Sequence, residues 1–245
     1  MHSTFKNADG LIASRTHGFI YVNVPKSACT TIKNLIYILD HGQEYKRPLA
    51  IHHDAQALLK ARSPDGMFDQ RCAASTFSFT FVRHPFLRAY SCFNEKVYAR
   101  GRWSFPRVTK MVETGYGARF PSEGEYSADQ HEANFHAFLL FVRDPKGGAT
   151  LPRPQAAHWE PQCQILRRHT RWHSLDFVGR VESFRDDMAF VLRKIGAEGR
   201  VDPGQRWNEG PPAPFKYEEV LSDRIRGLLE DVYGEDMAYF AYAPK

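Results

Sequence analysis

The stretch from Phe19 to Asp40 reads FIYVNVPKSACTTIKNLIYILD and decides the fold. Its first six residues, 19–24, are β-branched, aromatic or otherwise apolar apart from one Asn, a pattern typical of a buried strand. Pro25 ends that strand. Apolar residues then recur at helical spacing, which predicts a helix from Thr30 to about Asp40. The segment is therefore a strand, a short polar turn and a helix.

The same unit recurs twice further along the chain. Residues 76–82 (TFSFTFV) alternate Phe with smaller residues and predict a strand, which Pro85 separates from a helix with a broad apolar face. Residues 176–181 predict a third strand, and residues 183–195 predict the helix that follows it. Strands that alternate with helices favour an α/β fold with a mostly parallel sheet flanked by helices.

The remaining segments connect or follow these units. An insert rich in Gly, Pro and Arg over residues 101–174 holds one predicted helix, at 129–142. Such an insert either shapes the substrate side of an enzyme or is a plain surface excursion. Residues 199–214 form a Pro- and Gly-rich linker, and Tyr217 to Val232 is predicted as the final helix.

Length and composition fit one soluble globular domain. The chain has 245 residues, of which 42% are hydrophobic and 25% charged, and both fractions are ordinary for soluble proteins. We expect a single domain over 1–245. Within it, residues 19–100 hold the first two strand–turn–helix segments. Residues 101–174 form the insert, and residues 175–245 hold the third strand–turn–helix segment and the last helix.

The net charge and the absence of a targeting or membrane-spanning segment bear on the expected partner and location of the protein. Lys and Arg outnumber Asp and Glu by 33 to 28, which fits an anionic ligand or polymer. Like charges do not run in blocks of five or more, so we do not expect nucleic acid as the partner. Residues 1–14 do not form a signal peptide, and no stretch reaches the roughly 18 apolar residues that span a bilayer. We therefore expect a cytoplasmic location, and the pattern does not predict an oligomeric state.

Four cysteines, Cys29, Cys72, Cys92 and Cys163, are widely spaced and form no CxxC pair. In a chain of this length we expect them to be mostly reduced.

The turn after the first strand, residues 25–31, suits a phosphate group. Ligands of open parallel sheets bind at the carboxyl ends of strands, and a helix N-terminus offers N–H groups and a positive dipole. Lys26 adds a charge, and Thr30 and Thr31 add hydroxyl donors. The turn is not a Walker A loop, because that motif needs a Lys and a Ser or Thr after its second Gly. The alternative is that Thr30 or Thr31 simply caps the helix while Lys26 is solvated.

The turn after the second strand, in FVRHPFLRAYS (residues 81–91), offers a second anion site. Arg83 follows the strand directly, and Ser91 lies eight positions later on the predicted helix. A guanidinium and a hydroxyl group in these places can converge on one phosphate. The alternatives are a surface Arg83 and a Ser91 that bonds its own backbone.

Together the two turns resemble motifs of the sulfotransferases that use 3'-phosphoadenosine-5'-phosphosulfate (PAPS). VPKSACTTIK resembles the family's 5'-phosphosulfate loop, and RHPFLRAYS resembles its 3'-phosphate motif. HWEPQ (158–162), DFVGRVESF (176–184) and the segment 217–242 are similar to later motifs of the Golgi carbohydrate sulfotransferases that act on chondroitin, dermatan and related glycans. The resemblance spans residues 19–242 and implies a P-loop-NTPase-like α/β fold.

The resemblance also implies a reaction and roles for residues. The protein is expected to transfer a sulfuryl group from PAPS to a hydroxyl group of a sugar or glycan, and to release adenosine-3',5'-bisphosphate without a metal. A non-catalytic nucleotide- or glycan-binding protein on the same fold is the alternative. Lys26 is implied at the oxygen that bridges phosphate and sulfate. The residues implied in binding the two phosphates are Ser27, Ala28, Cys29, Thr30 and Thr31 for the 5'-phosphate, and Arg83 and Ser91 for the 3'-phosphate.

Two departures separate the chain from the Golgi enzymes. Residues 1–14 do not resemble their N-terminal membrane anchor, so we expect none here, and after HWEPQ the sequence has only Cys163 where they tend to carry paired cysteines. A soluble bacterial-type relative of these enzymes is therefore expected.

The general base that activates the acceptor hydroxyl is expected to be a histidine, since its pKa lies near neutral pH. Related sugar sulfotransferases often place a catalytic His or Glu between the first helix and the second strand. We favour His53, then His52, then His158, with Glu160 as a further candidate. The alternative for each histidine is a structural role.

Histidine pairs elsewhere do not predict a metal site. His131, Glu132 and His136 resemble the zinc motif HExxH, but the second His comes one position late and points away from the first on a helix. His169 and His173 lie near Cys163, yet the sequence offers no obvious further ligand.

Overall fold

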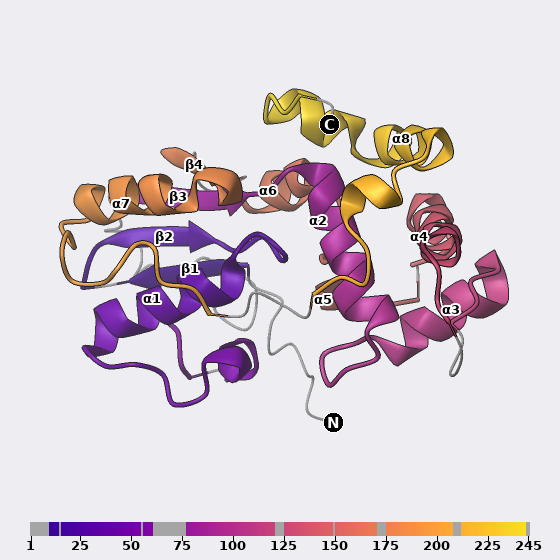
Figure 1. Ribbon diagram of the computed structural model, residues 1–245. Helices are drawn as coiled ribbons and strands as arrows, with labels where there is room; N and C mark the ends of the chain where they lie inside the picture. The colour runs from indigo at the N-terminus through magenta and orange to yellow at the C-terminus, as the bar shows by residue number, and fades with distance from the viewer. Residues whose placement is uncertain are drawn as a thin grey trace. The chain divides into compact units, whose positions relative to one another are not determined.

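The computed structural model describes residues 10–14, 16–54, 56–60, 77–120, 125–148, 150–170, 175–207 and 212–243. The chain forms two compact units, each with a hydrophobic core of its own (Figure 1). The first unit comprises residues 1–83 and 164–209, and the second comprises residues 84–163 and 210–245.

The first unit is built around a four-stranded sheet in the order β1-β2-β3-β4. β1 (Leu11–Ser14) is antiparallel to β2 (Phe19–Val22), whereas β2, β3 (Phe77–Val82) and β4 (Phe177–Arg180) are parallel to one another. The predicted α/β fold with a mostly parallel sheet flanked by helices is confirmed. Because parallel neighbours end at the same edge, the turns after β2 and β3 both begin at that edge.

Two helices pack against the aromatic side chains of this sheet. The strand register places Tyr21 and Phe81 on one face. α1 (Cys29–His41) and α7 (Phe184–Lys194) contribute to the same core cluster as these two rings, and the ring centroids of Phe81 and Phe184 lie 5.1 Å apart. Figure 1 shows both helices alongside the strands. The face is apolar because Phe alternates with smaller residues along β3.

Gly179 of β4 lies opposite Phe81 of β3. A Cβ atom at this position would lie 2.6 Å from the Cε1 atom of the Phe81 ring, which is closer than real Cβ contacts. The glycine in DFVGRVESF therefore leaves room for the Phe81 ring beside the neighbouring strand.

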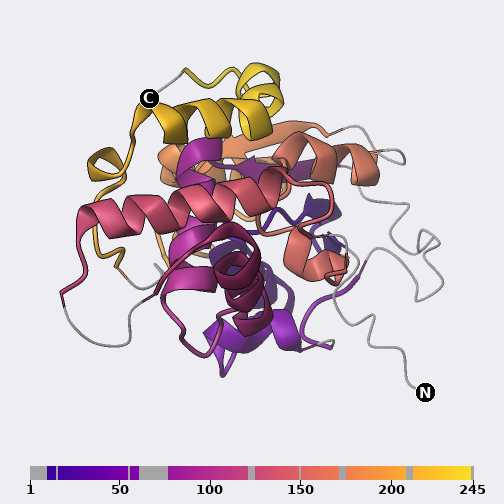
Figure 2. The ribbon, with the colours of Figure 1, turned by 90° about the vertical axis from the view of Figure 1, so that its right-hand side faces the viewer.

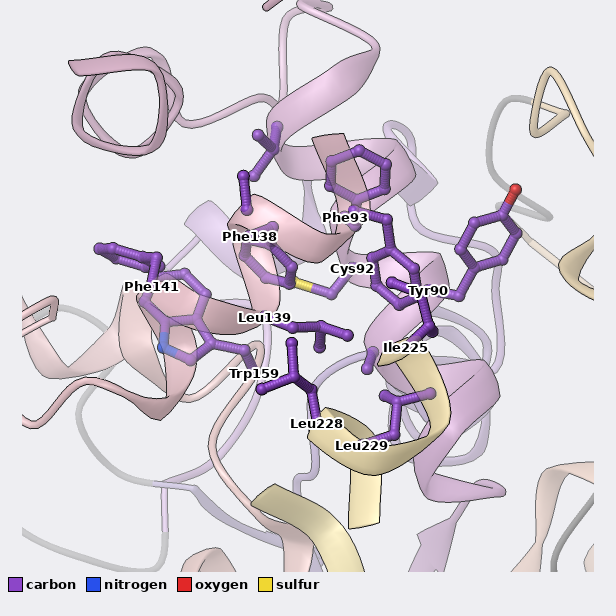
Figure 3. Packing of buried hydrophobic residues seen from close by; sticks show 14 of the residues in the cluster. Tyr90, Cys92, Phe93, Phe138, Leu139, Phe141, Trp159, Ile225, Leu228 and Leu229 are labelled. Carbon is purple, nitrogen blue, oxygen red and sulfur yellow. The ribbon is translucent and has the colours of Figure 1, made fainter. Parts of the chain in front are cut away.

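The second unit is helical. Its main elements are α2 (Pro85–Cys92) with the π-helical turn η3 (Phe93–Tyr98), α3 (Pro106–Tyr116), α4 (Ala128–Arg143), α5 (Arg153–Ala156), the short η5 (Tyr217–Glu219) and α8 (Asp223–Tyr239). Rings and aliphatic side chains from these elements interlock in its core, where Phe138 packs against both Phe93 and Trp159 (Figure 3).

Helices α4 and α8 run side by side (Figure 2). Ser127 and Gln130 form a capping box at the start of α4, and Ser222 caps α8. Glu132 of α4 accepts a hydrogen bond of 2.6 Å from the Ser222 hydroxyl and pairs with Arg224. The contact joins two helices that lie far apart in the sequence.

Several elements differ from the prediction. The first strand of the sheet, β1, was not predicted, since four residues carry too little pattern. The expected final helix over 217–232 is instead the single turn η5 followed by α8 at 223–239, because Ser222 starts a new helix. The insert holds α3, α5 and α6 (Gln162–Thr170) in addition to α4.

Across the part of the chain that the structure describes, the helices are too short or too polar to traverse a lipid bilayer.

Candidate active site

The turn between β2 and α1 has an unusual backbone. Lys26 and Ala28 have φ angles of 69° and 57°, in the left-handed region that residues other than Gly rarely adopt, and Ser27 between them does not. Such positions cost on the order of 1–3 kcal/mol each and cluster at functional sites. Alternation of this kind turns successive N–H groups inward into a concave anion-binding nest.

The start of α1 is not capped by a side chain. Ala28 is the N-cap residue, and Ala is among the poorest caps because it offers no acceptor. The first N–H bonded within the helix is that of Ile32, which donates to the carbonyl oxygen of Ala28 at 3.0 Å. The N–H groups of Cys29, Thr30 and Thr31 therefore precede the intrahelical ladder, at the positive end of the helix dipole.

The two threonine hydroxyls do not cap α1, contrary to the alternative drawn from the sequence. Thr31 exchanges two hydrogen bonds with the backbone of Trp207: its hydroxyl donates to the carbonyl oxygen at 3.1 Å and accepts from the N–H at 3.1 Å. Thr31 can therefore offer an anion its backbone N–H group but not its hydroxyl proton. The Thr30 hydroxyl oxygen lies 2.8 Å from Nε2 of His52.

Lys33 completes this group and was missed in the sequence. It lies among the apolar residues of α1, is only 6% exposed, and its Nζ atom lies 2.8 Å from Nδ1 of His52. Burial lowers its pKa to about 8. Lys33 falls about 100° around the helix from Ile32, beside the apolar face predicted from Ile32, Leu35, Ile36 and Leu39, so the periodicity gave no signal that it is buried.

His52 and His53 end the short helix η1 (Pro48–His53), where His52 is half-buried and His53 exposed. Asn34 of α1 holds the start of η1, because its Nδ2 group donates to the carbonyl oxygen of Pro48 at 3.1 Å. The structure thus brings His52 to the loop through Thr30 and Lys33.

Arg83 and Ser91 follow β3 as predicted. Arg83 comes directly after the strand and is half-buried, and Ser91 lies on α2 and is half-buried. Arg83 is the last residue of the first unit, whereas Ser91 belongs to the second.

The backbone of the motif HWEPQ is held in the second unit by hydrogen bonds from two buried side chains. The buried guanidinium of Arg88 donates to the carbonyl oxygens of Ala157 and Glu160, at 2.7 and 2.8 Å. The Tyr233 hydroxyl donates to the carbonyl oxygen of Trp159 at 2.7 Å. Nδ1 of His158 lies 3.0 Å from the carbonyl oxygen of Pro154, so Nδ1 carries a proton and Nε2 is the basic nitrogen.

Beyond this motif, Asp236 of α8 is fully buried. Its carboxylate accepts hydrogen bonds from the backbone N–H groups of Gln162 and Cys163, at 2.7 and 2.8 Å. These are the first residues of α6, so a residue from the end of the chain caps that helix.

Among the described residues, no three His, Cys, Asp or Glu side chains gather in a way that could hold a metal ion. His131 is buried in an aromatic core instead, with Nδ1 3.1 Å from the Tyr126 hydroxyl. Disulfide bonds do not join Cys29, Cys92 and Cys163 to one another, and Cys72 and His173 lie outside the described residues.

Comparison with known proteins adds independent information. The profile of the sulfotransferase family matches residues 9–243. Carbohydrate sulfotransferase 12 of Xenopus laevis is 27% identical over 262 residues, covering 97% of this chain and 61% of that protein. Carbohydrate sulfotransferase 11 of Rattus norvegicus is 27% identical over 199 residues, covering 77% of this chain and 53% of that protein. Carbohydrate sulfotransferase 8 of Mus musculus is 26% identical over 203 residues, covering 81% and 46%. The chain thus spans about half to three-fifths of the length of these relatives, and no solved structure matches it significantly.

Proposed function

Because the chain belongs to the sulfotransferase family, we propose that it transfers a sulfuryl group from PAPS to a hydroxyl group of a carbohydrate by in-line displacement. The observation that carries the proposal is the strained turn at Lys26–Ala28, which leads into a helix start with no side-chain cap; a turn of this kind suits an anionic group such as a phosphosulfate. The names of the matched relatives support a carbohydrate as the acceptor class.

The donor set of this turn fits a phosphosulfate group. An anion at the start of α1 meets the N–H groups of Cys29, Thr30 and Thr31 and the positive end of the helix dipole. When bound, PAPS supplies the sulfuryl group and a nucleotide oxygen that gains negative charge as it leaves. The Lys26 amine then stabilises that charge, and the N–H groups hold the 5'-phosphate without reorganising during the reaction.

We assign the 3'-phosphate to Arg83 and Ser91, because the guanidinium and the hydroxyl follow the strand next to the one that leads into the first turn. A bidentate guanidinium contact distinguishes a nucleotide with a 3'-phosphate from one without it. Arg83 therefore determines which nucleotide binds more than how fast the reaction runs.

The general base remains to be assigned among the histidines. We retain His53, which is exposed at the end of η1, and His158, whose Nε2 is the basic nitrogen. The ring nitrogens of His52 are both engaged, with Lys33 and Thr30, and this arrangement supports a different role for it.

Thermal melts with adenosine-3',5'-bisphosphate, ATP and AMP test the proposal. A ligand at 100 times its dissociation constant adds about 2.7 kcal/mol of stability, which for a chain of this length raises the Tm by roughly 5 to 10 °C. We expect that shift with the bisphosphate and a much smaller one with ATP or AMP. In Arg83→Ala, the preference for the bisphosphate over AMP should disappear. Equal shifts with all three nucleotides, or none, would contradict the proposal.

The alternative, a protein that binds the nucleotide without catalysis, predicts the same melts but no product. Transfer of radiolabelled sulfate from PAPS to a panel of oligosaccharides separates the two, and the oligosaccharide that is labelled identifies the acceptor.

A further inference from the structure

Lys33 occupies a place where a lysine is costly. It lies one turn after Thr30 on α1, between residues that pack in the sheet core, and is only 6% exposed. Burial disfavours the ammonium form and lowers the pKa of this group to about 8, so the amine still carries a proton at neutral pH. A buried ammonium group close to the start of α1 is stable only if a neighbouring group accepts a hydrogen bond from it.

Its partner is His52, and the bond fixes the proton on the imidazole ring. An ammonium group only donates, so Nδ1 of His52 accepts from Lys33 across 2.8 Å. A neutral imidazole then carries its single proton on Nε2, which donates to the Thr30 hydroxyl oxygen across 2.8 Å. Because that oxygen accepts this bond, the hydroxyl proton of Thr30 is directed to another acceptor.

The hydrogen bonds from Lys33 to His52 and from His52 to Thr30 connect two helices, α1 and η1, whose relative position is fixed by a further contact. Thr30 and Lys33 lie three residues apart on one helix and so project from the same side of α1. Asn34 ties that helix to η1 through the carbonyl oxygens of Thr30 and Pro48, at 2.8 and 3.1 Å. His52 is thereby held between the two side chains.

We propose that Lys33 and His52 are positioning residues that orient the Thr30 hydroxyl as a donor to the 5'-phosphate of the bound nucleotide. The inference rests on the proposed function. It gives His52 a role in binding the sulfuryl donor in place of the role of general base.

Binding should depend on pH through this group. The ionisable groups that act on Lys33 are His52 from η1, Cys29 from its own helix and Lys60 from the segment paired with β1. A bound anion favours the ammonium form. As the pH rises through about 8, Lys33 loses its proton and donates more weakly to His52, so affinity for the nucleotide should fall. In Lys33→Met this fall should be absent.

Isothermal titration with adenosine-3',5'-bisphosphate tests the coupling. Thr30→Val and His52→Leu should each weaken binding about tenfold, the value of one hydrogen bond to a charged group. The double variant should bind no more weakly than Thr30→Val alone, because both changes remove the same bond. His52→Gln keeps a donor near the Nε2 position and should restore most of the affinity. Thr114→Val, the same change at an exposed helical threonine of α3, is the control and should bind like the wild type.

Independent losses that multiply to about a hundredfold in the double variant, or full affinity in His52→Leu, would overturn the inference. A second measurement needs no variant: ¹⁵N NMR of the wild type should show His52 with its proton on Nε2, and a proton on Nδ1 would overturn the inference as well. Failure of the wild type to bind the bisphosphate would instead refute the proposed function itself.

Discussion

At the scale of single residues, the backbone of Lys26 and Ala28 sets the turn before α1 apart from an ordinary helix start. A glycine at either position would relieve the strain, and a Ser or Asp at the cap would satisfy the first turn of α1. The chain has neither, so no side chain caps α1 and the N–H groups of Cys29, Thr30 and Thr31 precede the hydrogen bonds within the helix.

Replacing Lys26 tests the chemistry of that turn. Lys26→Ala keeps the Cβ atom and so leaves the backbone strain unchanged, while it removes the amine. We expect kcat to fall by roughly 10²- to 10³-fold, as when one preorganised electrostatic donor is lost, with little change in Tm. Lys46→Ala removes an exposed lysine of the same unit and should leave the rate unchanged. Wild-type turnover in Lys26→Ala would refute the role proposed for this amine.

His131 gives the second unit an acid-sensitive core. Its ring is fully buried, and Tyr90 and Tyr98 contact it edge-on. Burial lowers the pKa of His131 to about 4. Between pH 6.5 and about 4 the unfolded chain therefore binds a proton that the folded chain does not, and stability falls as the pH falls through this window.

We expect this residue alone to account for roughly 2 to 3 kcal/mol of the lost stability. In His131→Phe, urea unfolding followed from pH 7 to pH 4 should show a flatter decline than in the wild type. His136→Phe, a half-buried position on the same helix, should keep most of the slope. An unchanged slope in His131→Phe would show that other groups cause the acid sensitivity.

At the scale of elements, the helix caps explain where prediction from sequence succeeds. The strand–turn–helix units around β2, β3 and β4 were predicted because their alternating or helical periodicity is strong. The Ser at 222 is as good a local signal, yet the apolar spacing from Tyr217 onward suggested one continuous helix. β1 and α6 depend on partners distant in the sequence: β1 pairs with β2, and α6 receives its cap from α8.

The cap on α6 makes a quantitative prediction. Asp236→Ala leaves two buried N–H groups, those of Gln162 and Cys163, without an acceptor, which should cost about 2 to 4 kcal/mol of unfolding free energy. Asp236→Asn keeps one acceptor oxygen, so its unfolding free energy should lie between that of the wild type and that of Asp236→Ala. Asp231→Ala, on the same helix but exposed and paired with Arg143 at 3.3 Å, should cost less than about 1 kcal/mol. Urea midpoints measure all three, and equal effects at 231 and 236 would contradict this account.

At the scale of the whole molecule, the chain passes between two cores, at residues 83–84, 163–164 and 209–210. The sequence places its motifs in order but carries little information on which core each helix joins. α2 follows β3 directly, yet its Phe86 belongs to the second core, and Phe93 of the adjoining η3 packs against Phe135 of α4. That choice depends on contacts distant in sequence, which periodicity does not record.

The candidate site shows the same division. Lys26, Thr30 and Arg83 were proposed from their places after predicted strands, and the structure has those strands; their roles in binding stay predictions. The bond from Lys33 to His52 joins residues 19 positions apart through a turn, η1, for which the sequence offered no periodic signal. The assignment of the general base and the location of the protein in the cell remain predictions.

The carboxylate that caps α6 also bears on how the protein is made. Asp236 follows Gln162 by 74 residues, so a ribosome has nearly completed the second unit before the cap exists. Until Asp236 has been made, the N–H groups of Gln162 and Cys163 lack the acceptor that holds the start of α6 in the folded unit, and the unfolded segment stays open to proteases. Chains that end a few residues before Asp236 should therefore be degraded faster than chains that include it.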